Sequence, residues 1–533
     1  MCTVFLCFFF LSGCKGCLST KAFISAARKT ALFAKEVYPE GTRPGRKGPF
    51  AVENHCRTIV RGGMRCMTAL CLAILCAIVP IDPARAESDT APATQGAEEG
   101  RKRSFSTGTD FFDEAGLSGG VYYFQRDRRR LDREKGRYAN HLNHATLTGV
   151  AEFSSGFIGG VLGADIGIFG THDIQSTGAP DHEMNFVPWG NPWHPDWSAT
   201  RTQDGVSVYK AQVKAKAGPL WAQGGYFQPS GPGVLGVNWS ILPGTYRGVN
   251  AGAEFGGFSL AMAWADAYKA PWYREVNEFY KNDGESRVPW LWSIGAKNAF
   301  EGGFSLEAAY GESKNHLWNA HLKAVYAKEQ EGSEDGLTAG YHLYLMGDND
   351  NTGASANDNF DGTASQHYLF VRYSADMWEF GLEGLYTRAP FTNEEQRGYF
   401  AYRLTDRNGS SKGAYEAWWD ARSDWNTHNE KAVFGSVRRS LDDILPVDGF
   451  AVKFGAGLGW DGEAYATAGH LKEWAFTLDI DYTHPDGPLK GAFVKLHLTN
   501  YTNGTEYPSW APYKNVFQSE RDIKVFAGIP FDI

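Results

Sequence analysis

Three blocks of the chain combine aromatic side chains with charged ones. In chain order, they contain Trp239, Tyr246 and Arg247; Tyr268, Trp272, Tyr273 and Arg274; and Trp418, Trp419, Asp420, Arg422 and Asp424. Flat aromatic rings can pack against the apolar faces of a pyranose ring, and charged groups can hydrogen-bond its hydroxyls. For a single Trp, anchoring a loop or lying at a membrane interface is the more common role. Taken together, the three blocks favour weak binding of a sugar.

The carboxyl groups of Asp420 and Asp424 also raise the possibility of glycoside hydrolysis. That reaction needs two carboxyls about 5 to 9 Å apart across the bound sugar, and their separation in sequence does not establish this geometry. The chain has no nucleophile elbow, HExxH motif or phosphate-binding loop. All eight Cys precede residue 87. The rest of the chain therefore has no Cys that could bind a metal together with a His. We therefore expect no enzymatic activity, no cofactor and no metal site.

The elements that position these residues are predicted to be strands. In the segments 161–168, 474–483 and 493–499, apolar residues alternate with glycine, polar or charged residues. Such a strand is wet on one face, which fits either a soluble sandwich or an outer-membrane barrel whose charged face lines the lumen. In the barrel, the predicted pore-lining residues are Lys210, Lys214, Lys216, Asp479, Asp481 and Lys495. Solvation of the wall alone would explain these charges equally well.

Three observations favour an all-β transmembrane antiparallel barrel. The alternating segments are too numerous for one sandwich, and allowing roughly 25 residues per strand and connection predicts about 18 strands, with 16 still possible. Short connections, such as 154–156, alternate with long ones, such as 170–205, as periplasmic turns alternate with external loops. Aromatic clusters at 122–124 and 290–292 are typical of interfacial girdles.

The front of the chain differs in composition from the rest. Residues 64–86 have an arginine, an apolar stretch, two prolines and an Ala-Arg-Ala site, which together predict a secretory signal peptide. A short transmembrane anchor is the alternative. We expect residues 1–63 to be an upstream extension from a start site placed too early, 87–115 to be a lead-in and 116–533 to be the barrel. The formal charge of −9 disfavours nucleic-acid binding.

Five blocks of the sequence resemble the chitoporins, the chitooligosaccharide-specific members of the OprD-type porin family. They are residues 117–132, 238–253 with PGTYRG, 268–274 (YKAPWYR), 418–431 with WWDARSD, and 482–498. The resemblance extends from about Gly116 to Ile533. It implies an 18-stranded barrel in the outer membrane of a Gram-negative bacterium, inserted among lipids by the barrel assembly machinery. It also implies passive uptake of N-acetylglucosamine oligomers by a monomer, although other chitin porins form trimers.

Two other functions remain open at the level of sequence. One is an OprD-type channel for amino acids, small carboxylates or other small polar solutes, in which a basic ladder draws in anions. The row formed by Lys210, Lys214 and Lys216 resembles that ladder, but Asp479 and Asp481 oppose it. This mixed wall suits a neutral, polar solute better than an anion. The other is a structural or adhesive surface protein, which would admit no sugar.

Overall fold

The computed structural model describes the barrel part of the chain. The described residues are 110–132, 134–178, 204–271, 273–329, 335–349, 359–392, 398–406, 409–463, 470–504 and 518–533. The predicted upstream extension and signal peptide, and most of the lead-in, lie outside these residues. Within them, no helix is long and apolar enough to cross a membrane.

Strands make up nearly all of the regular secondary structure in the described residues. A short helix, α4 (Asp110–Asp113), precedes β1, and a 3-10 turn, η4 (Gly487–Leu489), precedes β19. The strands are β1 (Gly116–Asp132), β2 (Arg137–Ser154), β3 (Leu162–Gly178), β4 (Gly205–Ala217), β5 (Leu220–Phe227), β6 (Thr245–Phe255), β7 (Phe258–Lys269), β8 (Asn277–Tyr280), β9 (Arg287–Val288), β10 (Leu291–Ala299), β11 (Phe304–Ser313), β12 (Leu317–Glu329), β13 (Gly336–Asp348), β14 (Thr363–Ala375), β15 (Trp378–Arg388), β16 (Lys431–Ser440), β17 (Phe450–Glu463), β18 (His470–Thr483), β19 (Phe493–Asn503) and β20 (Glu520–Asp532).

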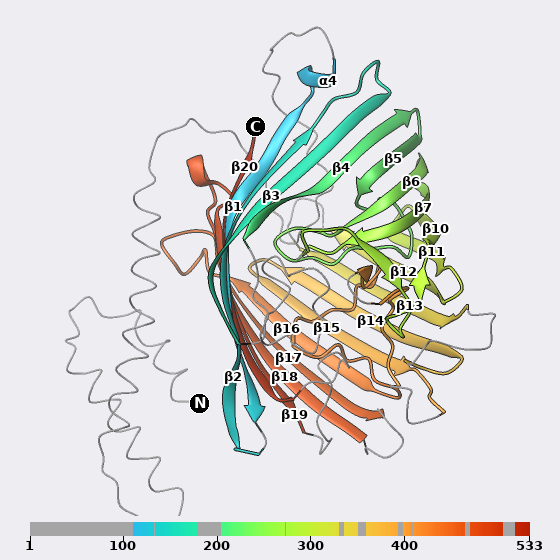
Figure 1. Ribbon diagram of the computed structural model, residues 1–533. Helices are drawn as coiled ribbons and strands as arrows, with labels where there is room; N and C mark the ends of the chain where they lie inside the picture. The colour runs from blue at the N-terminus through green and yellow to red at the C-terminus, as the bar shows by residue number, and fades with distance from the viewer. Residues whose placement is uncertain are drawn as a thin grey trace, which may run out of the picture. The chain divides into compact units, whose positions relative to one another are not determined.

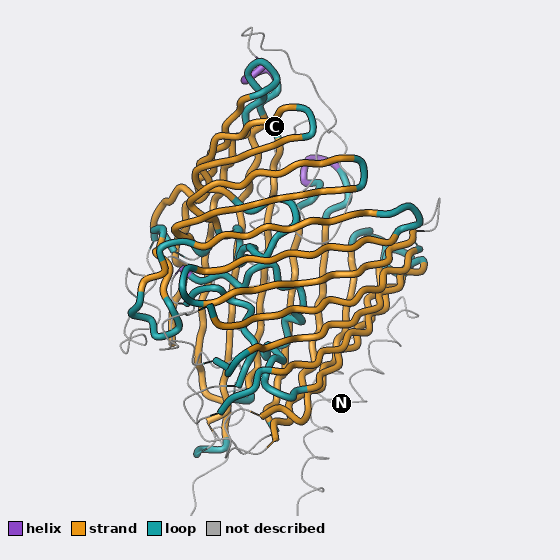
Figure 2. Tube along the Cα trace, turned by 90° about the vertical axis from the view of Figure 1, so that its right-hand side faces the viewer, coloured by secondary structure: helices purple, strands orange, loops and turns teal. Residues whose placement is uncertain are grey.

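Eighteen of these strands close into an antiparallel barrel, which confirms the predicted fold and the higher strand count. Each strand pairs with the next in the chain, except that β7 pairs with β10, and β8 and β9 form a small hairpin beyond β7. Closure comes from β1 pairing with β20, for example Arg126 opposite Lys524. Figure 1 shows these two strands side by side, and Figure 2 shows the inclined strands that encircle the lumen.

The connections are short at one end of the barrel and longer at the other. The turns at 218–219, 256–257 and 376–377 belong to the short end, where β1 begins and β20 ends. Short turns face the periplasm in outer-membrane barrels, whereas long connections face outside. The periplasmic end of this barrel is therefore the one that carries α4 and the end of β20 (Figure 1).

Alternating side chains separate the two faces of the wall. On β18, Phe476 and Ile480 are exposed on the outer face, whereas Glu473, Thr477 and Asp479 are buried toward the lumen. This is the alternation of an outer-membrane strand, with an apolar face toward lipid and a polar face toward water.

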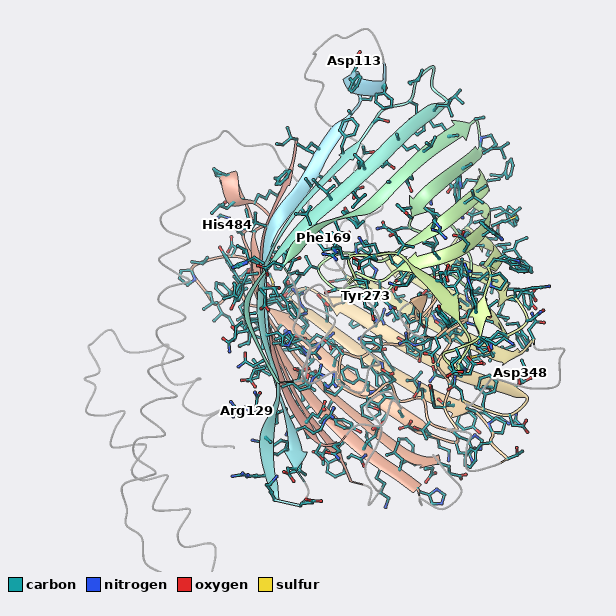
Figure 3. All side chains as sticks on the ribbon, viewed as in Figure 1. Asp113, Arg129, Phe169, Tyr273, Asp348 and His484 are labelled. Carbon is teal, nitrogen blue, oxygen red and sulfur yellow. The ribbon has the colours of Figure 1, made fainter. Side chains whose placement is uncertain are left out.

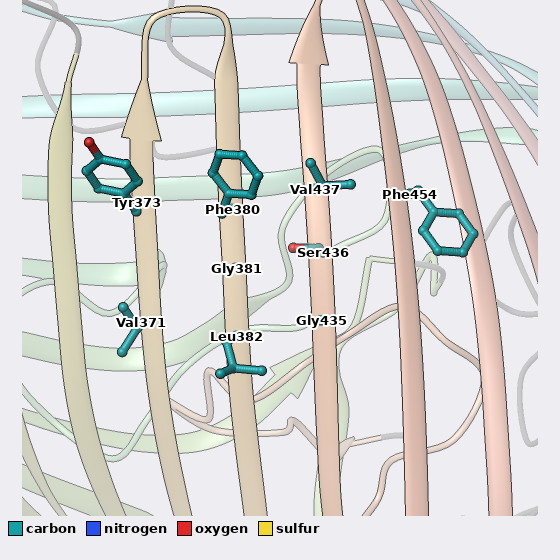
Figure 4. Close-up of a pocket in the computed structure, with 9 residues that line it drawn as sticks. All are labelled: Val371, Tyr373, Phe380, Gly381, Leu382, Gly435, Ser436, Val437 and Phe454. Carbon is teal, nitrogen blue, oxygen red and sulfur yellow. The ribbon is translucent and has the colours of Figure 1, made fainter.

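Four neighbouring strands illustrate the apolar outer face. Figure 4 shows Val371, Leu382, Val437 and Phe454 side by side on β14–β17, around a shallow groove over Gly435. Near the long-connection end, the outward rings of Trp264, Trp292, Tyr310 and Trp318 form part of an aromatic girdle.

The structure corrects three details of the predicted strands. β3 continues to Gly178, so the long connection begins nine residues later than expected; the strand extends by pairing with β2. A bulge opposite Gly167 and Ile168 turns Tyr209 inward, whereas strict alternation with the predicted pore-lining Lys210 puts it on the lipid face. Tyr122 and Phe124, which we expected in a girdle, also face the lumen.

Candidate functional site

Two long connections fold into the barrel. The first inner connection joins β5 to β6 (residues 228–244), and the second joins β15 to β16 (residues 389–430). The backbone N–H of Val234, in the first, donates to Ser293 Oγ on the inner face of β10 at 2.8 Å. Figure 3 shows the side chains of the described residues on the ribbon.

The second inner connection is attached both to the wall and to the first. Asn319 of β12 donates its side-chain amide to the carbonyl of Tyr402 at 3.1 Å. The N–H of Ala414 donates to the carbonyl of Val234 at 3.0 Å, which joins the two connections directly. The passage is therefore narrowed by a cross-linked pair of segments, not by two independent loops.

The stretch 416–421 of the second connection alternates between buried and exposed positions. Ala417, Trp419 and Ala421 pack toward the wall. Glu416, Trp418 and Asp420 share the opposite side, with 56%, 52% and 45% of their side chains exposed. We call these three residues the lumen row. They combine a flat ring with two carboxylates, the mixture that binding of a polar sugar requires.

Contacts behind the lumen row hold it in place. The ring of Trp419 stacks on Phe434 of β16 with centroids 5.2 Å apart, and its indole N–H donates to Glu383 of β15 at 2.8 Å. On the lumen side, the ammonium of Lys412 lies 5.2 Å from the centre of the Trp418 ring, in a cation–π contact. The two adjacent tryptophans thus have different roles, one as a support and the other as an exposed surface.

Asp420 anchors the lumen row to the last strands of the barrel. Its carboxylate lies 2.5 Å from Lys524 Nζ and 3.5 Å from His497 Nε2, and its carbonyl accepts a hydrogen bond from His497 at 3.1 Å. Burial would raise the pKa of this carboxyl, but Lys524 and His497 outweigh it and lower the pKa to about 2. Asp420 therefore stays negatively charged throughout the neutral range.

Backbone strain is concentrated in the second inner connection. Among its described residues, five non-glycine residues have positive φ: Tyr402, Asp420, Arg422, Trp425 and Asn429. Such backbone persists only when surrounding contacts determine it. Arg422 has such a contact, since its Nε lies 2.7 Å from Glu520 of β20. The connection is therefore built to hold one conformation.

Charged side chains form a cross-strand row on the wall beside Asp420. Arg126, Lys524, His497 and Asp479 lie directly opposite one another on β1, β20, β19 and β18. His497 Nδ1 lies 2.6 Å from Asp479 Oδ1. We call these four residues the charged row.

The predicted pore-lining group on β18 and β19 is adjacent to the charged row. Lys495 Nζ lies 3.5 Å from the carboxylate of Asp479 and 3.8 Å from that of Asp481. The structure thus brings these three predicted residues together on the lumen face.

The basic row on β4 also faces the lumen, with each lysine held by a partner. Lys210 lies 2.5 Å from Glu152 of β2, and Lys214 lies 2.8 Å from Asp165 of β3. Lys216 lies 4.1 Å from the centre of the Phe157 ring. Acidic residues on the neighbouring strands β2 and β3 therefore offset the positive charge of the lysines on β4.

Several predicted aromatic residues form the scaffold of the inner connections. Tyr246 and Tyr268 are buried and contact each other with ring centroids 4.7 Å apart. The hydroxyl of Tyr268 accepts the backbone N–H of Asn238, and that of Tyr246 donates to the carbonyl of Gly236. Both hydroxyls therefore hold the first inner connection in place.

The remaining predicted binding residues are dispersed. Tyr273 is buried, and Figure 3 places it inside the barrel. Arg247 lies on the outer face, 2.7 Å from Asp266, and Arg274 pairs with the neighbouring Glu275. Trp239 is 42% exposed, Asp424 is half-buried and interacts electrostatically with Lys412, and Trp272 lies outside the described residues.

Sequence reasoning missed four contributors: Glu416, Lys412, His497 and Arg126. The first two belong to an irregular connection, where no periodicity marks which side chains face the lumen. His497 and Arg126 do alternate with outward residues, so alternation on β19 and β1 was a usable signal for them.

Comparison with known proteins gives the same architecture. The chain matches the family described as outer membrane porin, OprD family, over residues 109–520. It is 39% identical over 444 residues to a chitoporin of Escherichia coli strain K12, covering 79% of this chain and 92% of that protein. Among solved structures, it is similar to Pseudomonas aeruginosa OpdK with vanillate (TM-score 0.61, 16% identity) and Acinetobacter baumannii OccAB3 (TM-score 0.64, 14% identity), each covering 79% of this chain and 100% of the other.

The two structures share the fold at low sequence identity, whereas the chitoporin match extends over most of both chains. A polar lumen, an apolar outer band and short turns at one end are features that the barrel itself displays. The chain belongs to the OprD family of porins of the Gram-negative outer membrane.

Proposed function

We propose that this porin admits chitooligosaccharides, oligomers of N-acetylglucosamine, by passive diffusion through a weak binding site. The lumen row carries the proposal, because it exposes the ring of Trp418 between two carboxylates at the narrowed part of the passage. The ring offers a surface to one apolar face of a sugar, and the carboxylates accept hydrogen bonds from hydroxyl and amide groups. The likeness to a chitoporin supports the choice of sugar.

The charge balance of the lumen favours a neutral solute over an anion. Lys210, Lys214, Lys495 and Lys524 all lie within 4 Å of a carboxylate oxygen. A channel selective for carboxylates would present cations that the protein does not itself neutralise. An OprD-type channel for amino acids or small carboxylates remains the second candidate, because β4 does present its basic row to the lumen.

We propose transport without catalysis, by a monomer inserted by the barrel assembly machinery. Of the pair suggested by sequence, Asp420 and Asp424, the first does not suit the general acid of a glycosidase. A general acid must hold a proton near neutral pH, whereas Lys524 and His497 keep the pKa of Asp420 at about 2. Asp420 instead has a role in holding the lumen row in place.

The test is single-channel conductance in a planar bilayer, titrated with chitohexaose, maltohexaose and an amino acid. The parent should be blocked most strongly by chitohexaose. Replacing Trp418 with Ala should weaken that blocking by about threefold to tenfold, by analogy with nucleobase stacking on aromatic residues. Open-channel conductance should stay the same or rise, because small ions do not need the ring.

Two variants complete this test. Trp418→Phe keeps an aromatic ring and should retain most of the blocking. Trp264→Ala removes an exposed outer-face tryptophan and should leave blocking unchanged. Stronger blocking of the parent by the amino acid than by chitohexaose would favour the second candidate. Equal blocking by the two sugars would contradict specificity for chitooligosaccharides.

A further inference from the structure

Four aromatic rings line the lumen on the periplasmic side of the charged row. They are Tyr122 and Phe124 of β1, Phe493 of β19 and Phe526 of β20, and we call them the exit cluster. Phe526 contacts all three others, with ring centroids 6.0, 5.8 and 5.0 Å away, and Tyr122 lies 6.4 Å from Phe493. The rings therefore form one continuous aromatic surface across three strands.

These rings face the lumen and not lipid. They alternate with Val121, Ile523 and Ile529, which are exposed on the outer face. Tyr122 also packs against a cluster that contains Leu242, from the first inner connection. Only side chains on the inner face can meet that connection.

Glycine makes room for the cluster. A Cβ on Gly528 would lie 2.5 Å from the ring of Tyr122 and 2.7 Å from that of Phe493, and a Cβ on Gly120 would lie 2.7 Å from Tyr122. The two rings therefore extend over bare backbone. All four rings are nevertheless only half-buried, so part of each ring remains open to the passage.

Other aromatic rings inside this barrel, such as Tyr268, Tyr344 and Phe434, are buried under the inner connections, whereas those of the exit cluster are only half-buried. Apolar groups exposed to water in a passage are a surface on which a solute with apolar faces can pack. A pyranose oligomer has such faces on successive rings, whereas a simple inorganic ion or an amino acid does not.

The strand register makes the cluster contiguous with the site at the constriction. In the charged row, Arg126 lies opposite Lys524. Two residues further toward the periplasm, Phe124 lies opposite Phe526, which lies opposite Lys495. Each two-residue step along a strand covers roughly 7 Å, little more than the length of one sugar unit.

The next step in the same direction completes the cluster. Tyr122 lies opposite Gly528, and Gly528 lies opposite Phe493. The exit cluster thus begins one two-residue step to the periplasmic side of the charged row, which contacts Asp420. It ends one step further in the same direction.

Polar groups border the cluster as they border Trp418. Lys495 lies in the same cross-strand row as Phe124 and Phe526, and its ammonium lies 3.8 Å from Asp481. The hydroxyls and amides of a sugar bound to the rings would therefore find a cation and a carboxylate beside them.

We propose that the exit cluster is a second sugar subsite, which binds the leading rings of an oligosaccharide while the lumen row still holds the trailing ones. This inference rests on the proposed function, and it adds a site on β1, β19 and β20, to the periplasmic side of the charged row that contacts Asp420. Two weak subsites in series would lengthen the dwell time of long oligomers without a single tight site that would stop conduction.

The test uses the full protein in planar bilayers, with Phe493 and Phe526 both replaced by Leu. Leucine retains apolar volume but not the flat face. We expect the dissociation rate of chitohexaose to rise by about threefold to tenfold, by analogy with loss of stacking, and that of chitobiose to change little. The conservative pair F493Y/F526Y should restore the parent's rate.

Controls separate binding from folding. Phe476→Leu removes an exposed ring from the outer face of β18 and should leave dissociation unchanged. Open-channel conductance and heat-modifiable migration show that each variant is folded. Unchanged chitohexaose dissociation in the folded Leu pair, while Trp418→Ala weakens blocking, would overturn the exit cluster and leave the proposed function intact.

Failure of the proposed function has a different signature. A parent that binds maltohexaose as well as chitohexaose would contradict the choice of sugar. In that case, faster release of both sugars from the Leu pair would still support a pyranose subsite at the cluster. Absence of blocking of the parent by either sugar would overturn both proposals.

Discussion

The lumen wall has two sides that differ in the size of their inward side chains. On β7, β10 and β11 the inner face carries Ala263, Ala265, Ser293, Gly295 and Gly311. On β1, β19 and β20 it carries long charged and aromatic residues, including those of the charged row and the exit cluster. The small residues lie where the first inner connection packs against the wall. The large ones lie where the second inner connection reaches the wall through side chains, such as those of Asp420 and Arg422.

Contacts at the glycines account for the difference. A Cβ on Gly295 would lie 2.6 Å from the backbone of Pro232, and one on Gly311 would lie 2.4 Å from the side chain of Val234. The first inner connection therefore lies directly against the backbone of β10 and β11. Small inward residues thus identify the wall that the first inner connection covers at backbone distance.

The first prediction removes a charge from the side of the wall that carries long charged residues, and we expect it to have the largest effect. Asp522 lies 2.6 Å from Arg126, and both side chains are almost completely buried. Removing one partner of a buried pair leaves the other charge uncompensated, so Asp522→Ala should cost about 3–5 kcal/mol of folding stability. Heat-modifiable migration should show a lower unfolding temperature and a smaller folded fraction.

The matched control for Asp522→Ala is Glu379→Ala. Glu379 pairs with Arg438 at 2.6 Å, but half of its side chain is exposed, so we expect little change. Equal effects of the two variants would show that burial of the closing ion pair adds no stability.

The second prediction enlarges a small residue on the side of the wall that the first inner connection covers. Gly295→Val should force the first inner connection away from β10, because the clash is with backbone and cannot be relieved by a rotamer change. Overpacking of this kind costs about 1–3 kcal/mol. We expect a lower unfolding temperature together with altered conductance, because the connection narrows the passage.

Gly435→Ala is the control for this clash. Gly435 faces lipid on β16, and a Cβ there would have no atom within 4 Å. This variant should keep the parent's conductance. Normal conductance in Gly295→Val would mean that the connection adapts, and that the small residues are not required by its position.

The third prediction concerns the pH dependence of the stability that Asp420 contributes on the charged side of the wall. We expect it to be the smallest of the three effects. The pKa of Asp420 falls from its ordinary 3.8 to about 2 when the chain folds, so the carboxylate contributes stability above about pH 4 that is lost as pH falls toward 2. The difference in unfolding temperature between the parent and Asp420→Asn should be constant from about pH 8 to 5 and should vanish toward pH 2. A difference that already shrinks between pH 7 and 5 would contradict the pairing with Lys524.

Much of the wall could be predicted from the sequence, because alternation is a local property of a strand. It predicts the lumen faces of β18 and β19, with Asp479, Asp481 and Lys495 on them. It went wrong at Tyr209, because a bulge adds one residue and reverses the face of its neighbours. It also could not separate the rings of Tyr122 and Phe124 from a girdle, since aromatic residues suit both places.

The site itself was less predictable, for a physical reason. The composition of a Trp-rich connection is the same whether its rings support a fold or face a solute. Trp418 and Trp419 are adjacent and identical in type, yet only Trp418 is exposed. Their roles depend on contacts with strands that are distant in sequence, such as the bond from Trp419 to Glu383 and that from Asp420 to Lys524.

The attachments of the second inner connection set an order of events during biogenesis. Asp420 and Arg422 both pair with β20, through Lys524 and Glu520, and β20 closes the barrel against β1. Until that last strand is in place, the lumen row lacks these two ion pairs and is held at this end only by contacts such as that of Asp420 with His497 of β19. The attachment of the lumen row is therefore completed by the same step that seals the barrel.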